Sequence, residues 1–214
     1  MKRVVLFTTA ALVALAFAGV AGGAAPDGVA GPWADFVVAA SQGPTAGGGA
    51  VPAARSNPQN AVGPAEAPPG DDPVPGNTFF SLGFGGTITL GFENPICNGK
   101  GYDFDIDVVE ITQEPYPPEI VNVYVSKTGA SFAFAGQIAK DGSVSMPAGI
   151  DVAHYVRLVD VSDSSLFTAD LHADGFDVDG VKARDTHCKD EHDKCSGVTF
   201  WPTNPPPPFR RRGG

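Results

Sequence analysis

Apolar and polar residues alternate with a period of two through most of the chain from Phe79 to Ala183. In the clearest case Ile88, Leu90 and Phe92 are separated by threonine or glycine, which is typical of a strand with one buried face. Similar short runs recur along the chain between turn signals. The pattern predicts strands at 33–40, 79–93, 102–110, 121–126, 131–139, 154–161 and 176–183.

Turn residues separate these runs at regular intervals. Asn94-Pro95 and Asn98-Gly99 are expected to end one strand and turn the chain before the next. Later turns are expected at 127–129, 140–142 and 160–165. No period of 3.6 residues is found between Thr78 and Arg184, so the sequence predicts an all-β domain of the sandwich or barrel type.

Three segments fall outside this pattern. Residues 1–25 combine Lys2 and Arg3 with an apolar run and small residues, which predicts a secretory signal peptide, with an uncleaved membrane anchor as the alternative. The β domain is then 26–184, with a long Gly/Pro/Ala-rich loop at 43–76. Residues 185–214 form an irregular tail that ends in four consecutive prolines and three arginines, an extended spacer outside the core.

Charge and export limit the partners. The chain has 24 acidic against 14 basic residues, which argues against nucleic acid and anionic lipid as ligands. After signal cleavage no membrane contact is expected. The predicted location is secreted, periplasmic or at the cell surface.

Several motifs resemble one family when they are taken in order. The chain resembles bacterial secreted and cell-surface domains of the discoidin-like (galactose-binding-like) jelly-roll type, in the segments Ala34–Val38, Asn60–Gly63, Ser81–Leu90, Asn98-Gly99 with Gly101, Asp105–Glu110, Val123–Ser126 and Ala173–Asp179. The resemblance implies a jelly-roll β-sandwich and a binding or surface role, with no particular ligand. Tyr102–Phe104 departs from the pattern as a short insertion, so either Asp103 or Asp105 could take the equivalent position.

Acidic residues are the first candidates for chemistry. Asp103, Asp105 and Asp107 alternate with apolar residues and would repel one another on one strand face unless water, a basic partner or a cation compensates them. The resemblance implies a structural Ca²⁺, which takes several oxygen ligands including backbone carbonyls. The predicted ligands are Asp105, Glu110, Asp174 and Asp177, and the alternative is that these acids are solvated.

The cysteines lie mostly in the tail. Cys188 and Cys195 close a short loop, and in an exported protein a disulfide between them is the leading prediction. Zinc bound by His187, Cys188, His192 and Cys195 is the alternative. Cys97 is left as a buried thiol, as a partner for one of the other two, or as a site of pairing between molecules.

The remaining residues favour binding over catalysis. No Gly-x-Ser-x-Gly motif occurs, the four histidines form no recognisable triad, and a lone acid pair such as Asp105 and Glu110 is weak support for a hydrolase. The expected function is a non-catalytic extracellular binding or adhesion module for a glycan or another cell-surface component. A structural envelope protein without a small ligand is the alternative, and a hydrolase is the third. Six aromatic residues could either form a platform on which a sugar stacks or pack in the core. They are Trp33, Tyr102, Tyr116, Tyr124, Phe132 and Phe134.

Overall fold

Two antiparallel β-sheets face each other in the computed structural model, which describes residues 32–66, 78–99, 103–111, 117–186 and 188. The predicted signal peptide and most of the tail therefore lie outside the described residues. The five-stranded sheet has, in spatial order, β1 (Phe36–Ser41), β3 (Thr87–Cys97), β8 (Val152–Asp160), β5 (Ile120–Ser126) and β6 (Ala133–Ala139). The four-stranded sheet has β2 (Phe80–Ser81), β9 (Asp177–Ala183), β4 (Ile106–Glu110) and β7 (Gly142–Val144).

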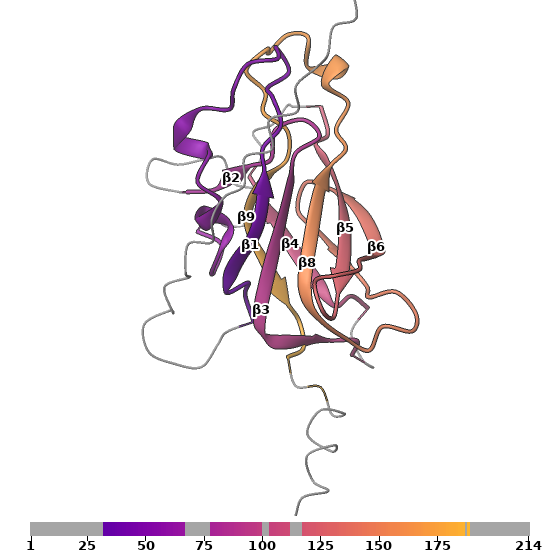
Figure 1. The fold of residues 1–214 in the computed structure, drawn as a ribbon. Coiled ribbons are helices and arrows are strands. Elements are labelled where there is room, and N and C mark those ends of the chain that lie inside the picture. Colours follow the sequence, from indigo (N-terminus) through magenta and orange to yellow (C-terminus); the bar gives the residue numbers. More distant parts are fainter. Residues whose placement is uncertain (1–31, 67–77, 100–102, 112–116, 187, 189–214) are drawn as a thin grey trace, which may run out of the picture.

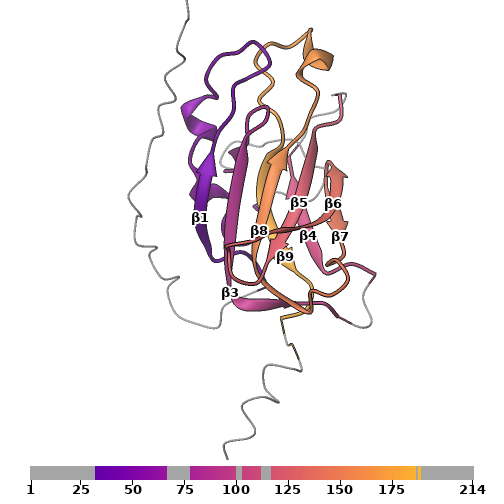
Figure 2. The ribbon, with the colours of Figure 1, turned by 45° about the vertical axis from the view of Figure 1, so that its right-hand side comes forward.

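The strand pairs are nested inside one another. β5 pairs with β6, β4 with β7, β3 with β8 and β2 with β9, so the chain runs as one long antiparallel hairpin folded over on itself. The two layers and the extra edge strand β1 are visible in Figures 1 and 2. This arrangement confirms the predicted jelly-roll β-sandwich. The described residues contain no α-helix, only the 3₁₀ turns η1 (Ala53–Arg55), η2 (Pro58–Ala61) and η3 (Ser164–Phe167).

The core lies between the sheets because successive side chains of a strand point to opposite faces. Val156 and Leu158 of β8 are fully buried, whereas Tyr155 and Arg157 point outward and are only partly covered. Phe176, just before β9, is also fully buried. The inward residues of both sheets make one apolar cluster, which includes Ile88, Leu90, Ile106, Val108, Val121, Val123, Val178 and Val181.

Two strand predictions are wrong in detail. β3 does not end at Asn94-Pro95 but continues to Cys97, and its pairing with β8 is irregular between Gly91 and Ile96. A proline is tolerated at such an irregularity because its missing N–H breaks no ladder bond there. The turn expected at 140–142 follows β6 at residues 140 and 141, but Gly142 already begins β7, a strand that the sequence analysis did not predict.

The described part of the long loop covers the sandwich. Val51 and Ala61 are buried, and Ala61 belongs to the main core cluster. Gly43 lies so close to the 83–84 backbone that a Cβ there would be 2.2 Å from the carbonyl oxygen of Phe84. A glycine-rich sequence thus allows a close backbone approach at this point.

The disulfide joins Cys97 to Cys188, so the predicted pairing of Cys188 with Cys195 is wrong. The backbone N–H of Cys97 donates to the carbonyl of Asp185 (2.9 Å), which brings the residues after β9 beside the end of β3. The alternative zinc site is also excluded, because the sulfur of Cys188 is in the disulfide and is not available as a thiolate ligand. A disulfide is typical of a protein exported to an oxidising compartment.

None of the described segments forms a helix with the length and apolar character needed to cross a membrane.

Candidate functional site

Four acidic side chains are buried together at one end of the sandwich. Glu110 ends β4, Asp177 begins β9, Asp174 lies in the turn before it and Glu119 directly precedes β5. Their exposed fractions are only 2%, 7%, 3% and 4%, respectively. Acidic residues are rarely buried to this degree unless they are paired. These four residues are called the carboxyl cluster below.

The carboxyl groups disfavour one another's charge. Burial, followed by the carboxylates of Asp177, Glu110 and Asp174, raises the pKa of Glu119 to about 10. Burial and then the neighbouring Asp174 carboxylate raise the pKa of Asp177 well above its usual range. The cluster therefore needs positive charge, or protons, to be stable in the folded protein.

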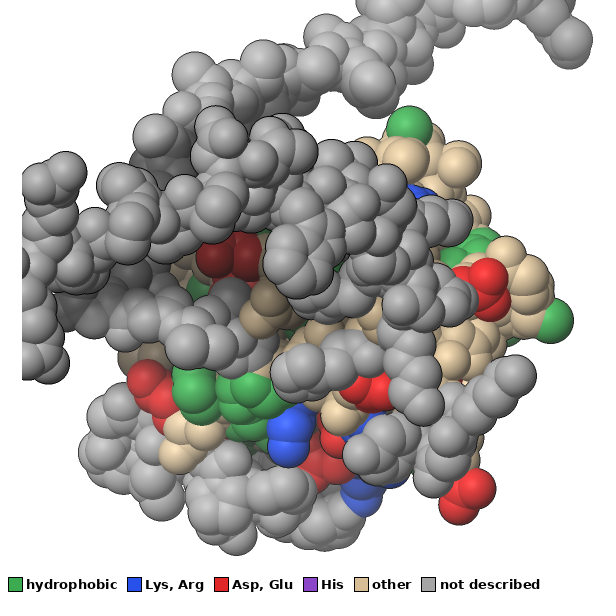
Figure 3. All heavy atoms as spheres, turned by 90° about the horizontal axis from the view of Figure 1, so that it is seen from below, with side chains coloured by type: hydrophobic (Ala, Val, Ile, Leu, Met, Phe, Trp, Pro, Cys, Tyr) green, Lys and Arg blue, Asp and Glu red, His purple; other side chains and the backbone are tan. Residues whose placement is uncertain are grey.

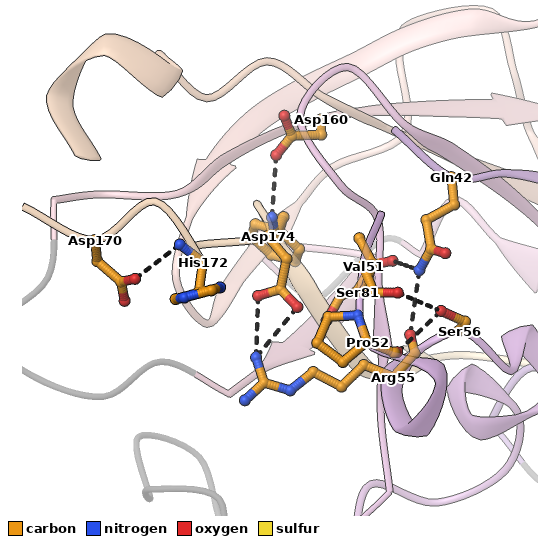
Figure 4. A network of polar contacts seen from close by, with 11 residues as sticks. Gln42, Val51, Pro52, Arg55, Ser56, Ser81, Asp160, Asp170, His172 and Asp174 are labelled. Carbon is orange, nitrogen blue, oxygen red and sulfur yellow. Dashed lines mark hydrogen bonds and ion pairs between the residues drawn. The ribbon is translucent and has the colours of Figure 1, made fainter. Parts of the chain in front are cut away.

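Arg55 supplies one positive charge. Its Nη1 atom lies 3.0 Å from Oδ1 and 3.2 Å from Oδ2 of Asp174 (Figure 4). The same guanidinium lies 5.3 Å from the ring centre of Phe79. Burial outweighs this arginine, so the pKa of Asp174 is still raised.

Two polar atoms beside the cluster, Asp177 Oδ1 and Ser81 Oγ, have no partner with good hydrogen-bond geometry among the described residues. The Ser81 hydroxyl is nevertheless close enough to Asp174 and Asp177 to lower the pKa of both carboxyl groups, against the stronger effect of burial. The two atoms lie side by side because Ser81 of β2 pairs directly with Asp177 of β9. Buried polar atoms normally have a partner, so an exception points to a missing ion or water. Carboxylate and hydroxyl oxygens suit a hard cation such as Ca²⁺. As the side chains stand, no group of three acidic, histidine or cysteine residues in the described segments could hold a metal ion.

Asp160 borders the cluster but is already satisfied. Its carboxylate accepts from the backbone N–H of Gly85 (3.0 Å) and of Phe176 (3.0 Å) and from Ser162 Oγ (2.7 Å), and Figure 4 shows it beside Asp174. It therefore holds the 83–86 and 174–176 turns together at this end of the sandwich.

The structure separates Asp105 from the other predicted ligands. Asp105 precedes β4 while Glu110 ends it, so the two residues are roughly 17 Å apart along an extended chain. Both Asp105 oxygens accept backbone N–H groups, from Gly99 (3.0 Å) and Met146 (2.7 Å). Asp105 therefore fixes two loops at the opposite end of the strand, and the predicted set of four ligands is not brought together.

The predicted stripe of acids on one strand face is also absent. Asp103 and Asp105 come before β4, which begins at Ile106, and only Asp107 lies on the strand. Asp107 pairs with Arg184 (2.7 Å). Basic and acidic side chains lie side by side at the lower end of the molecule (Figure 3).

Replacing Asp105 with alanine is expected to lower the free energy of unfolding by about 2 kcal/mol, because two backbone N–H groups lose a charged acceptor. Urea unfolding measures the change. Asp103→Ala is the matched control, since Asp103 is exposed and its side chain accepts no hydrogen bond that we observe in the described residues. Equal stability of the two variants would contradict the structural role of Asp105.

A second candidate site lies on the outer face of the five-stranded sheet. Tyr124 of β5 and Phe134 of β6 meet edge to face, with ring centres 5.5 Å apart, and Phe134 is 52% exposed. Arg157 of β8 stacks on Phe132 at 3.8 Å from the ring centre. With Tyr155, these residues make up what we call the aromatic face. Arg157 is fixed further by its Nε bond to Thr89 Oγ1 (3.0 Å).

A cavity of about 540 Å³ adjoins the aromatic face. It opens between the β5–β6 connection and the loop before β8, and Phe132 forms part of its wall. Its lining is mixed: the polar residues Ser126, Lys127, Thr128 and Ser131 lie on one side, and Ile150, Asp151 and Val152 lie on the other. This volume is within the range of small-molecule sites.

The other aromatic candidates do not join this face. Trp33 lies on the opposite sheet, bridged to Lys182 of β9. Tyr102 and Tyr116 lie outside the described residues. Arg157 was missed by the sequence analysis, although its outward position in the period of β8 was the signal that could have found it.

Comparisons with known proteins do not identify a family for this chain. No family model matches the chain, and no curated protein matches it. Among solved structures, the chain is similar to the C-terminal domain of a chitobiase from Bacteroides fragilis, with 15% identity and a TM-score of 0.42 over 72% of this chain and 93% of that one. A likeness this distant does not establish the discoidin-like family.

Proposed function

We propose that this chain is a non-catalytic extracellular module that binds carbohydrate on its aromatic face. The observation that carries the proposal is the exposed Phe134 ring, which lies against Tyr124 beside the Arg157–Phe132 stack and the adjoining cavity. Sugars present apolar C–H faces that pack on aromatic rings, and hydroxyls that bond to groups such as a guanidinium. An aromatic pair on an outer face with one exposed ring favours a binding surface over core packing.

The rival function is a structural envelope protein, whose sandwich packs against neighbours without a small ligand. A glycan array separates the two, because a purely structural protein should give no reproducible sugar signal. A hydrolase is the weakest alternative. The acids that lie together are buried, so they are poorly placed to reach a glycosidic bond.

We also propose that a Ca²⁺ ion stabilises the domain at the carboxyl cluster, with Glu110, Asp174 and Asp177 retained from the predicted ligands and Glu119 in place of Asp105. Support comes from the two buried oxygens that lack a well-aligned partner in the described residues, and from the mutual repulsion and burial that raise the pKa values of Glu119 and Asp177. Bound Ca²⁺ would balance these charges, and water or backbone carbonyls would complete its shell. Small rotations of the side chains are required to gather the ligands.

Replacing Phe134 with alanine is expected to weaken binding to a glycan identified on the array at least about tenfold, since an exposed aromatic anchor is lost, and tenfold corresponds to about 1.4 kcal/mol. Isothermal titration calorimetry measures the affinity. The fold should be preserved because the ring is half exposed.

Leu166→Ala is the control for this experiment, because Leu166 is equally exposed (55%) but lies on η3, away from the aromatic face. Equal affinities of wild type and Phe134→Ala would place the glycan elsewhere. A wild-type protein without any array signal would favour the structural role.

A further inference from the structure

The outer face of the four-stranded sheet has a groove of its own, on the side of the sandwich opposite the aromatic face. Its volume is about 680 Å³. It is called the Trp33 groove below, and its principal lining residues are Trp33, Lys182, Asp107, Ser143, Asp141 and Glu66.

The strand register builds one wall of the groove as a row across the sheet. Trp33 forms a bridge with Lys182 of β9, Lys182 pairs with Asp107 of β4, and Asp107 pairs with Ser143 of β7. Residues directly opposite in antiparallel strands share a face. Since Val108 and Val181 point into the core, this row points outward. An aromatic ring, an ammonium, a carboxylate and a hydroxyl therefore follow one another at strand spacing.

The position of the Trp33 ring depends on a glycine. Gly180 pairs with Val109 in the next row of the sheet. A Cβ on Gly180 would lie 3.0 Å from the six-membered ring of Trp33, so the missing side chain lets the indole lie close against the sheet. The ring that lines the groove is therefore held by the sheet backbone, which favours a ring position that is set before a ligand arrives.

The polar groups retain bonding capacity beside the ring. Asp107 Oδ1 accepts from Ser143 Oγ (2.6 Å) and from Arg184 Nε (2.8 Å), which orients the carboxylate. Asp141 Oδ1 accepts from the backbone N–H of Glu110 (2.7 Å). Each carboxylate has a second oxygen that can accept from a ligand. Lys182 Nζ lies over the Trp33 ring, 5.6 Å from its centre, in a cation–π contact, and its N–H groups are donors; a sugar that stacks on this ring would displace the ammonium toward the ring edge.

This combination matches one class of ligand better than others. Three acidic residues against one lysine in the lining disfavour phosphates and other anions. The charged side chains of Lys182, Asp107 and Asp141 in the lining disfavour a lipid chain. A sugar ring can stack on Trp33 while its hydroxyls donate to carboxylates and accept from an ammonium.

We propose that the Trp33 groove is a second carbohydrate site, in which a sugar ring stacks on Trp33 and hydrogen-bonds to Lys182, Asp107 and Asp141. The inference rests on the proposed function only for the chemical class of the ligand, since the residues differ from those of the aromatic face. Two sites on opposite sheets allow one domain to bridge two glycan chains, which would raise the avidity for a surface that carries many copies.

Fluorescence of Trp33 tests the groove directly. The chain has two tryptophans, so Trp201→Phe leaves Trp33 as the sole reporter, and Phe134→Ala in the same protein weakens the aromatic face. The probes are the soluble glycans that give an array signal with the wild type. Titration is expected to shift the Trp33 emission and to saturate. An emission that stays unchanged with every glycan positive on the array would contradict sugar binding in the Trp33 groove. It would not contradict binding on the aromatic face.

Variants that remove negative charge from the groove provide a second test of the proposal. Asp141→Asn removes the negative charge but keeps an oxygen that can accept from the backbone N–H of Glu110. Asp107→Asn likewise removes the charge but keeps an oxygen that can accept from Ser143 Oγ. The double variant, made in the same background, is expected to bind at least fivefold more weakly in the Trp33 titration. Binding equal to that of the background would overturn the proposed contacts. A wild type with no array signal at all would contradict the carbohydrate function, and with it the ligand class of the groove.

Discussion

Replacing both Cys97 and Cys188 with serine is expected to lower the free energy of unfolding by about 4 kcal/mol. The bond joins residues 91 positions apart, and cross-links that close long loops restrict the unfolded chain most. This would be a large part of the stability of a single domain. Equilibrium urea unfolding of the oxidised wild type and the double variant measures the difference.

Cys195→Ser is the matched control for this experiment, and it should leave stability nearly unchanged. Reduced wild type should behave like the double variant, because both lack the same cross-link. A loss of stability in Cys195→Ser as large as in the double variant would restore the pairing of Cys188 with Cys195. Equal stability of the double variant and the oxidised wild type would contradict the bond between β3 and the segment after β9.

Adding Ca²⁺ to chelator-treated protein is expected to raise the melting temperature by roughly 5–10 °C. At about 100 times the dissociation constant, one site adds about 2.7 kcal/mol through mass action. For a domain of this size each kcal/mol corresponds to roughly 2–4 °C. The shift should saturate as the Ca²⁺ concentration rises, and calorimetric scans in Ca²⁺ and in excess chelator measure it.

Variants of the carboxyl cluster test whether Ca²⁺ raises the melting temperature by binding there. Glu119→Gln and Asp177→Asn are expected to abolish the shift, since each removes a carboxylate from the cluster, whereas Asp105→Ala should keep it. The informative quantity is the difference between the two solutions, because removing one of several repelling carboxyl groups also changes the stability of the protein without the ion. A shift that survives in Glu119→Gln would place the ion elsewhere. No shift in the wild type would rule out a calcium site of useful affinity.

Local alternation predicted the strands but not their partners. The runs around Ile88, Val123 and Leu158 were found because a buried face repeats every second residue. β7 was missed because Gly142 and its neighbours read as a turn, and only pairing with β4 makes them a strand. The proline at position 95 was taken to end β3 because the irregular pairing that tolerates it depends on β8.

The candidate sites were harder to predict for the same reason. Glu110, Asp174 and Asp177 were found as acids near strands, but Glu119 follows two prolines and reads as part of a turn. Its burial becomes evident only when the nested pairs are assembled. Asp105 was included because it shares a motif with Glu110, yet they lie at opposite ends of β4. The distance between Cys97 and Cys188 in sequence hid the disulfide, which exists because β3 and β9 end on the same side of the sandwich.

The nested pairing also dictates an order of folding. β5 and β6 are joined by a short connection and can meet early, whereas β4 with β7, β3 with β8 and β2 with β9 each require the closure of a progressively longer loop. We therefore expect slow assembly from the central hairpin outward, as in other proteins dominated by distant contacts. Cys97 and Cys188 come together only when the outer strands have closed, so oxidation of this pair would mark the completion of the sandwich.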